Sequence, residues 1–124
     1  MRHGRRTEEG MIDYIPQPPV EARSWLRTNP NPSALATNRF GSTERALAFV
    51  NGLYARGATE VLVDDPGVDS TGEPYADTLI VKCEEWSSVQ HRIEQFCEEE
   101  GRGDLPPGDF TMDRTSDGLR LWWD

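Results

Sequence analysis

Two short apolar runs separated by an acidic loop constrain the fold of this chain more than any other feature. Val61–Val63 is followed by paired carboxylates and a Pro-Gly pair, and Leu79–Val81 comes after the loop. Short β-branched runs bounded by turn-forming residues are typical of buried strands rather than of helices. The connection from Asp65 to Asp77 is too long for a two-residue turn and contains glycine and proline. We therefore expect two strands joined by a mobile surface loop.

The segment 43–56 carries the clearest helical pattern. Its apolar residues recur at spacings of three and four, which places them on one face of a helix. Ser42 stands where an N-cap residue is favoured, and Gly57 stands where helices commonly end in the left-handed conformation. The aromatic residues on this face are interpreted as part of a core rather than as a ligand site.

A second helix is predicted from about Ser88 to Glu100. Ser87 begins a capping-box pattern, and an apolar stripe follows it. Glu98, Glu99 and Glu100 end this helix, although the helix dipole favours cations there. We expect these glutamates either to be solvated or to meet an arginine-bearing surface, on the front half of this chain or on a partner.

The chain ends in a pattern typical of a β-hairpin. Asp117-Gly118 predicts a two-residue turn between a strand at Phe110–Arg114 and a closing strand at Leu119–Trp123. In the closing strand, Leu119, Leu121 and Trp123 alternate with Arg120 and Trp122, so the two groups lie on opposite faces of the sheet.

The face that carries Arg120 and Trp122 is expected to point away from the helices, close to Leu62, Ile80 and Lys82. Aromatic and arginine side chains are enriched where proteins bind one another. We expect this face to be covered by the N-terminal part of the chain or by a second copy of the chain, and otherwise to bind a partner.

Residues 1–32 are interrupted by prolines and are expected to form an N-terminal arm with a flexible start and a docked segment. A short helix is predicted at about 19–27, because proline suits a first helical position. Trp25 or Leu26 would anchor the arm, since an exposed tryptophan leaves much apolar surface in water. Residues 33–124 would then form one α+β domain.

The predicted order of elements is strand, helix, strand, strand, helix and strand, with a possible extra strand near Phe110. This order matches the ferredoxin-like split βαβ pattern (βαββαβ), a two-layer sandwich with both helices on one face of an antiparallel sheet. The first strand would come from Ser33–Phe40 or, alternatively, from Met11–Ile15. The fold hosts enzymes, metal carriers, RNA binders and regulatory modules, so it does not by itself predict a function.

Charge is distributed unevenly along the chain. The formal net charge is −9, with +3 in residues 1–58 and −12 in residues 59–124. The acidic second half disfavours nucleic acid as a ligand, because phosphate binding requires lysine and arginine. No apolar run is long enough for a transmembrane helix, and the start lacks the apolar stretch of a secretory signal. We expect a cytoplasmic protein whose acidic surface serves solubility or binds a basic protein or a cation.

The motifs of common catalytic and cofactor sites are not recognised in the sequence. It has no phosphate-binding glycine loop, no zinc-protease pattern and no nucleophile elbow. Cys83 and Cys97 do not have a CxxC spacing and are expected to be free thiols, with a disulfide as the alternative. We therefore expect no cofactor.

The acidic loop 64–77 is the one cluster with possible metal chemistry. Asp64, Asp65, Asp69 and Asp77 could offer oxygen ligands to calcium or magnesium. Their spacing is not that of an EF-hand, so these residues are weak candidates and we expect no tight metal site.

The missing catalytic motifs favour a small non-catalytic interaction or regulatory module. It would bind a protein partner, or a second copy of the chain, through its acidic surface or the open face of its sheet. The candidate contact residues are Trp122, Arg120, Glu98, Glu99 and Glu100. The alternative is a small-ligand or divalent-cation binding protein, or an enzyme, that uses the loop 64–77. The sequence leaves the identity of the partner and the oligomeric state open.

Overall fold

A five-stranded sheet forms the centre of the protein in the computed structural model, which describes residues 5–6, 12–13, 15–84 and 86–124. Neighbouring strands run antiparallel in the order β3-β4-β7-β9-β8. The strands are β3 (Val20–Glu21), β4 (Glu60–Val63), β7 (Thr78–Lys82), β9 (Gly118–Trp123) and β8 (Phe110–Arg114).

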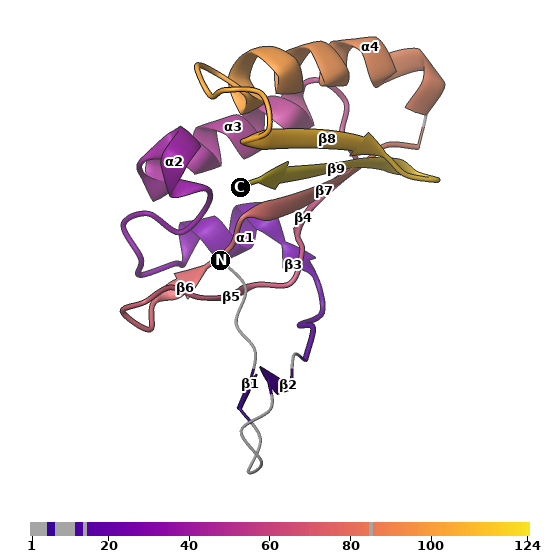
Figure 1. The fold of residues 1–124 in the computed structure, drawn as a ribbon. Helices are drawn as coiled ribbons and strands as arrows, with labels where there is room; N and C mark the ends of the chain where they lie inside the picture. The colour runs from indigo at the N-terminus through magenta and orange to yellow at the C-terminus, as the bar shows by residue number, and fades with distance from the viewer. Residues whose placement is uncertain (1–4, 7–11, 14, 85) are drawn as a thin grey trace.

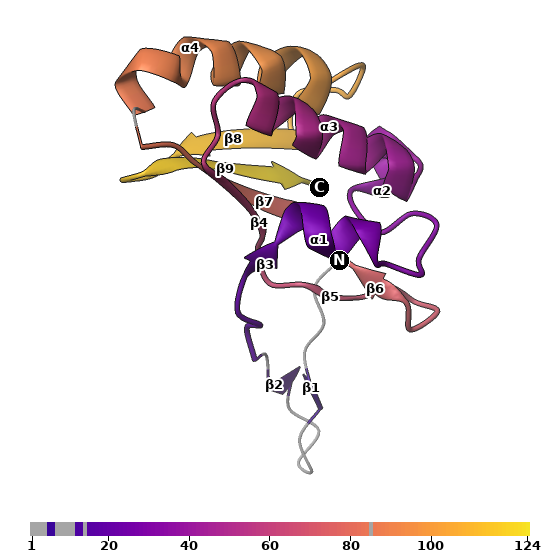
Figure 2. The ribbon, with the colours of Figure 1, turned by 180° about the vertical axis from the view of Figure 1, so that it is seen from behind.

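Four α-helices pack with this sheet (Figures 1 and 2). They are α1 (Ala22–Arg27), α2 (Thr37–Phe40), α3 (Thr43–Ala55) and α4 (Trp86–Phe96), and α4 continues into the π-helical turn η1 (Cys97–Gly101). Two small two-stranded pairs lie outside the main sheet. They are β1 (Arg5–Arg6) with β2 (Ile12–Asp13), and β5 (Gly67–Val68) with β6 (Pro74–Tyr75).

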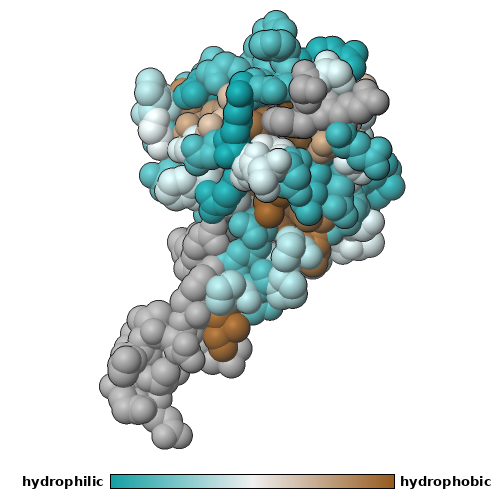
Figure 3. Space-filling view, turned by 90° about the vertical axis from the view of Figure 1, so that its right-hand side faces the viewer, coloured by the Kyte–Doolittle hydropathy of each residue, from teal (hydrophilic) through white to brown (hydrophobic). Residues whose placement is uncertain are grey.

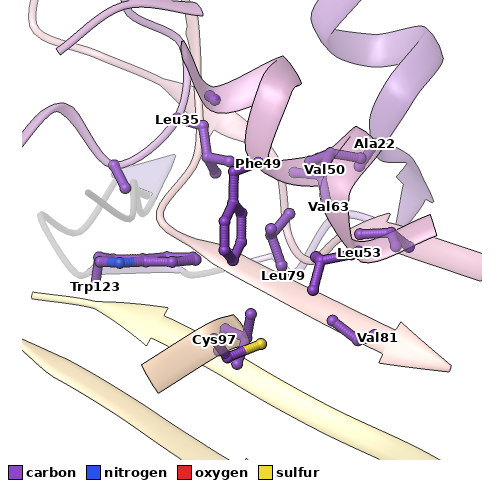
Figure 4. Packing of buried hydrophobic residues seen from close by; sticks show 14 of the residues in the cluster. Ala22, Leu35, Phe49, Val50, Leu53, Val63, Leu79, Val81, Cys97 and Trp123 are labelled. Atoms are coloured by element: carbon purple, nitrogen blue, oxygen red, sulfur yellow. The ribbon is translucent and has the colours of Figure 1, made fainter. Parts of the chain in front are cut away.

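Helix α3 forms where its sequence pattern predicts. Ser42 Oγ accepts a hydrogen bond from the Arg45 N–H, and Gly57 follows the helix with φ +116°. The helix buries Ala46, Phe49, Val50 and Leu53. Figure 4 shows Phe49 pointing from α3 toward the sheet, between Trp123 and Leu79.

The core is aromatic at its centre. The Phe49 ring lies edge-on to Trp123 at 6.0 Å, and Phe40 and Phe110 contact the same indole at 5.4 and 5.3 Å. Trp123 is 1% exposed, and its Nε1–H donates to the Gly101 carbonyl at 2.8 Å. The indole therefore buries a large apolar area while its polar group stays hydrogen-bonded.

The ferredoxin-like order is not confirmed, because the strand order differs. The predicted first strand, Ser33–Phe40, is wrong: the segment forms a single parallel bridge, Leu35 with Ala76, and then α2. The first strand of the main sheet is the short β3 instead, which pairs with β4 at one edge. Of the alternative segment Met11–Ile15, Ile12–Asp13 pairs with β1, and Met11 and Tyr14 lie outside the described residues. Alanine and asparagine are weak strand formers, whereas Val20 is β-branched.

The N-terminal helix starts later than its proline predicts. Helix α1 begins at Ala22, so no proline occupies its first position, and Glu21 caps it by accepting from the Arg23 and Ser24 N–H groups. Leu26 is 2% exposed and belongs to the core, and Trp25 packs against that core. Residues 15–19 are exposed. The division of the chain at residue 32 stays a prediction.

The second helix also differs at its start. It begins at Trp86, so Ser87 lies inside the helix rather than before its first residue. At the other end, the backbone widens into η1, and the Arg102 N–H donates to the Cys97 carbonyl five residues earlier. Ile93 and Cys97 are buried, as the apolar stripe predicts.

The C-terminal hairpin is confirmed, with a different turn. Phe110 pairs with Trp123 and Arg114 with Leu119, so Gly118 belongs to β9 and not to the turn. A Cβ atom on Gly118 would overlap the Val81 carbonyl of β7. The glycine is required by a close approach of two backbones rather than by a left-handed conformation.

The loop between β4 and β7 contains the small strand pair β5–β6. Asp69 closes its turn by accepting from the N–H and hydroxyl groups of Thr71 and from the Glu73 N–H. Asn31 Nδ2 donates to the same carboxylate at 3.0 Å and to the Pro74 carbonyl at 2.9 Å. The mobility expected for this loop stays a prediction.

Candidate functional site

The open face of the sheet, defined here by Leu62, Ile80, Lys82, Arg120 and Trp122, lies opposite the buried face. Directly paired residues of antiparallel strands share a face, and Leu62 pairs with Ile80, which pairs with Arg120. Trp122 lies two residues beyond Arg120, on the same side of β9. The predicted alternation is therefore confirmed.

The apolar members of the open face are partly exposed, whereas the opposite side of β9 is closed. Leu62, Ile80 and Trp122 are half-buried. Leu119 and Leu121 are fully buried, and Trp123 is 1% exposed. Figure 3 shows, from one side, that hydrophobic patches lie among a mostly hydrophilic surface.

Carboxylates surround the cations of the open face. Arg120 Nε lies 3.8 Å from Asp64 Oδ2, and Lys82 Nζ lies 4.0 Å from Glu60 and 3.8 Å from Asp117. Asp113 of β8 stands directly opposite Arg120 of β9 in the strand register, so the two residues share this face. Partly exposed ion pairs of this kind contribute little to stability. The open face thus has an apolar centre and an acidic border.

The three predicted contact residues Glu98, Glu99 and Glu100 lie elsewhere. They belong to η1, which continues α4, and Figure 1 shows α4 packed on one face of the sheet. Trp122 lies on the other face, because it alternates with the buried residues of β9. Glu98 forms an ion pair with Arg102, and Arg39 Nε donates to the Glu100 carbonyl at 2.9 Å. The structure therefore brings Arg120 and Trp122 together and separates them from the three glutamates, of which Glu98 forms an ion pair with an arginine of this chain.

The four candidate metal ligands have separate roles. Asp64 faces Arg120, Asp65 accepts from the Gln17 N–H at 2.8 Å, and Asp69 closes its turn. Asp77 accepts from the Thr78 hydroxyl at 2.8 Å. Within the part of the chain that the structure describes, no group of three or more His, Cys, Asp or Glu residues could hold a metal ion.

A second site, which we name the arginine pocket, was missed by the sequence analysis. Its volume is about 440 Å³, and it is lined by residues of α2, of α3 and its C-cap, of the end of α4 and of η1. Arg39, Arg45 and Arg56 supply its cations. Its apolar residues are Phe40, Phe49 and Phe96. Arg45 and Gly52 of α3 and Arg56, its C-cap residue, recur at helical spacing, which was the sequence signal for this pocket.

A hydrogen-bonded cluster joins the edge strand to the helices. Tyr54 Oη donates to Glu21 Oε2 at 2.6 Å and accepts from the Val61 N–H at 3.0 Å, while the Arg23 guanidinium stacks 4.0 Å from the Tyr54 ring. Burial raises the pKa of Glu21, but the hydrogen bonds from Tyr54 and from the Ser24 and Arg23 N–H groups outweigh it and lower that pKa to about 2. Burial and the hydrogen bond to Glu21 raise the pKa of Tyr54. This cluster has a structural role, although Arg23 Nε is buried without a hydrogen-bond partner among the described residues.

Comparison with known proteins does not assign the chain to a class. No protein-family model matches it, and searches of curated proteins and of solved structures find no significant similarity. Over the described residues, none of the helices has the length and apolar character needed to cross a membrane.

Proposed function

We propose that this protein is a small non-catalytic interaction module that binds a basic protein partner through its open face. The observation that carries the proposal is that Trp122 shares the face of the sheet that the helices do not cover with Arg120, Leu62 and Ile80, all of them partly exposed. An aromatic residue next to arginine and aliphatic side chains is the composition typical of interface centres.

The acidic border favours a basic partner over a second copy of the chain. Glu60, Asp64, Asp113 and Asp117 border the face, and the whole chain carries a formal net charge of −9. Two copies that met through this face would bring like charges together, whereas a partner rich in lysine and arginine would be attracted. The same charge argues against nucleic acid as the ligand.

The state of the cysteines supports a reducing compartment, which we take to be the cytoplasm. Cys83 and Cys97 are free and buried. Free buried thiols are common where glutathione and thioredoxin keep cysteines reduced.

Capture from the cell of origin tests the proposal. The tagged full chain, W122A and the matched variant V68A are compared at low and at high salt, since Val68 is an exposed apolar residue outside the open face. We expect wild type and V68A to capture the same basic protein, and W122A to lose it. High salt should release it, because screening weakens charge-driven contacts.

Two outcomes contradict the proposal. A protein captured equally by wild type and W122A binds elsewhere on the surface. A lower sedimentation coefficient for W122A than for wild type, in the absence of any captured protein, means that the open face joins two copies of the chain instead.

A further inference from the structure

The arginine pocket holds cations that form no ion pair with a carboxylate of the residues that the structure describes. Arg102, Arg114 and Arg120 each form an ion pair with a carboxylate. Among the described residues, by contrast, no ion pair joins Arg39, Arg45 or Arg56 to a carboxylate, although acidic residues outnumber basic ones 22 to 13 in the sequence. The pocket lining contains three guanidinium groups and one carboxylate, that of Glu100. Its charge is thus opposite to that of the whole chain.

Two of these arginines are held in place by contacts that leave donors available. The Arg56 guanidinium lies 3.9 Å from the Phe96 ring centroid, and its Nη1 donates to the Gly52 carbonyl at 3.2 Å. Arg39 uses Nε to bind the Glu100 carbonyl and lies 5.3 Å from the Phe40 ring centroid. A guanidinium has five N–H donors, so each retains donors for a ligand. Fixed arginines lose less conformational entropy when they bind an anion.

The inner wall of the pocket is aromatic. The Phe49 and Phe96 rings stack at 5.2 Å with 10° between their planes. A Cβ atom on Gly52 would overlap the Phe96 ring, so this glycine allows the ring to lie directly against α3. Phe49 is buried and Phe96 is partly exposed. Because the Arg56 guanidinium and the Phe49 ring both stack on Phe96, a flat apolar group can contact only the part of the Phe96 ring that stays exposed, next to three guanidinium groups.

We propose that the arginine pocket binds a small organic anion with an aromatic body and a carboxylate group. The arginines would bind the carboxylate by charge-assisted hydrogen bonds, and the ring would contact the part of Phe96 that Arg56 and Phe49 leave exposed. A pocket of about 440 Å³ lies within the range of small-molecule sites. The site is independent of the open face, because it lies in the helix layer on the other side of the sheet.

Titration with 1-naphthoate tests this site. Binding to the isotope-labelled full chain is followed by calorimetry and by amide chemical shifts, with uncharged 1-naphthamide and inorganic phosphate as comparison ligands. We expect 1-naphthoate to bind at millimolar or lower concentration and to shift amides of α3 and α4. Naphthamide tests the need for the negative charge, and phosphate tests the need for the aromatic body.

Variants of Arg45 separate the site from the fold. The Arg45 side chain forms no ion pair among the described residues, so R45Q should fold normally. We expect R45Q to lower the affinity for 1-naphthoate about tenfold, because one charge-assisted hydrogen bond is lost. R45K should bind with intermediate affinity because it keeps the charge. The matched control is R92Q, an exposed arginine of α4 outside the pocket lining, which should bind as wild type does.

Three results would overturn the proposal: no binding of 1-naphthoate at millimolar concentration, equal affinities of R45Q and R92Q, or naphthamide or phosphate binding as well as 1-naphthoate. None of them bears on capture of a protein through Trp122, and loss of that capture does not bear on this pocket. The two proposals therefore fail separately.

Discussion

The carboxylate of Glu21 connects three elements at once. Glu21 is the last residue of β3, and its carboxylate caps α1 and accepts a hydrogen bond from the Tyr54 hydroxyl of α3. Because the pKa of Glu21 is lowered from 4.5 to about 2, the folded state favours the ionised form. Its contribution to stability is therefore fully present above about pH 4.5 and is lost as the pH falls toward 2.

Replacing Glu21 by glutamine should show this pH dependence. We expect E21Q to lower the free energy of unfolding by about 1–2 kcal/mol at pH 7, a value reduced for solvent screening of a partly exposed group. The loss should be smaller at about pH 3, where the unfolded chain no longer ionises this residue fully. Urea unfolding of wild type and E21Q at both pH values measures this difference in the free energy of unfolding. E84Q, at an exposed carboxylate, is the control, and equal pH profiles for E21Q and E84Q would contradict the assignment.

Cys97 is the second residue with a chemical prediction. It is fully buried, and burial raises the pKa of its thiol to about 12. The thiolate is the reactive form, so we expect slow alkylation by iodoacetamide in the folded protein at pH 8 and rapid alkylation in urea. Cys83, which is 8% exposed and donates its S–H to the Gly57 carbonyl, is the internal comparison. Peptide mapping that finds Cys97 alkylated faster than Cys83 would contradict the packing.

At the scale of elements, the contact between β7 and β9 depends on a missing side chain. Gly118 pairs with Lys82, and a Cβ atom there would overlap the Val81 carbonyl, which is backbone and cannot rotate away. We expect G118A to destabilise the protein by more than about 3 kcal/mol.

The comparison variant for this strand contact is G72A. Gly72 has φ +86° but no atom near its Cβ position, so only backbone strain of about 1 kcal/mol is expected. Urea unfolding of both variants measures which of them loses more free energy of unfolding. If G72A costs as much as G118A, steric contact between β7 and β9 is not the reason for the glycine.

Elements that depend on neighbouring residues were predictable from the sequence. Helix α3 has its cap, its apolar stripe and its terminal glycine within one continuous segment, so local rules were sufficient. The C-terminal hairpin likewise joins adjacent segments. Edge strand β3 was not predictable, because its two residues are held by β4 and by Tyr54, which lies 33 positions from Glu21.

The two candidate sites likewise differ in how much of each could be predicted from neighbouring residues in the sequence. Alternation along β9 was enough to place Arg120 and Trp122 on one face. The arginine pocket needs α2, α3 and the end of α4 side by side, and the sequence showed only the stripe of α3. The apolar members of that stripe predict a core, whereas Arg45 and Arg56 indicate a pocket only once α2 and α4 are placed beside them.

At the scale of the whole molecule, the helices close one face of the sheet and leave the other open. This division makes neighbouring tryptophans unequal. Trp123 contacts the rings of Phe40, Phe49 and Phe110 and is 1% exposed, whereas Trp122 is half-buried among the residues of the open face. One-residue alternation thus separates a residue needed for folding from one available to a partner.

Alanine substitutions at the two positions test this division. We expect W123A to lower the free energy of unfolding by about 3–5 kcal/mol, because it leaves a cavity in the aromatic core and an unpaired Gly101 carbonyl. W122A should cost less than about 1.5 kcal/mol, since it removes a side chain that is already partly in water. Urea unfolding measures both, and circular dichroism confirms that W122A keeps its secondary structure. If the two variants lose the same free energy of unfolding, both faces of β9 belong to the core. The open face would then not be a binding surface.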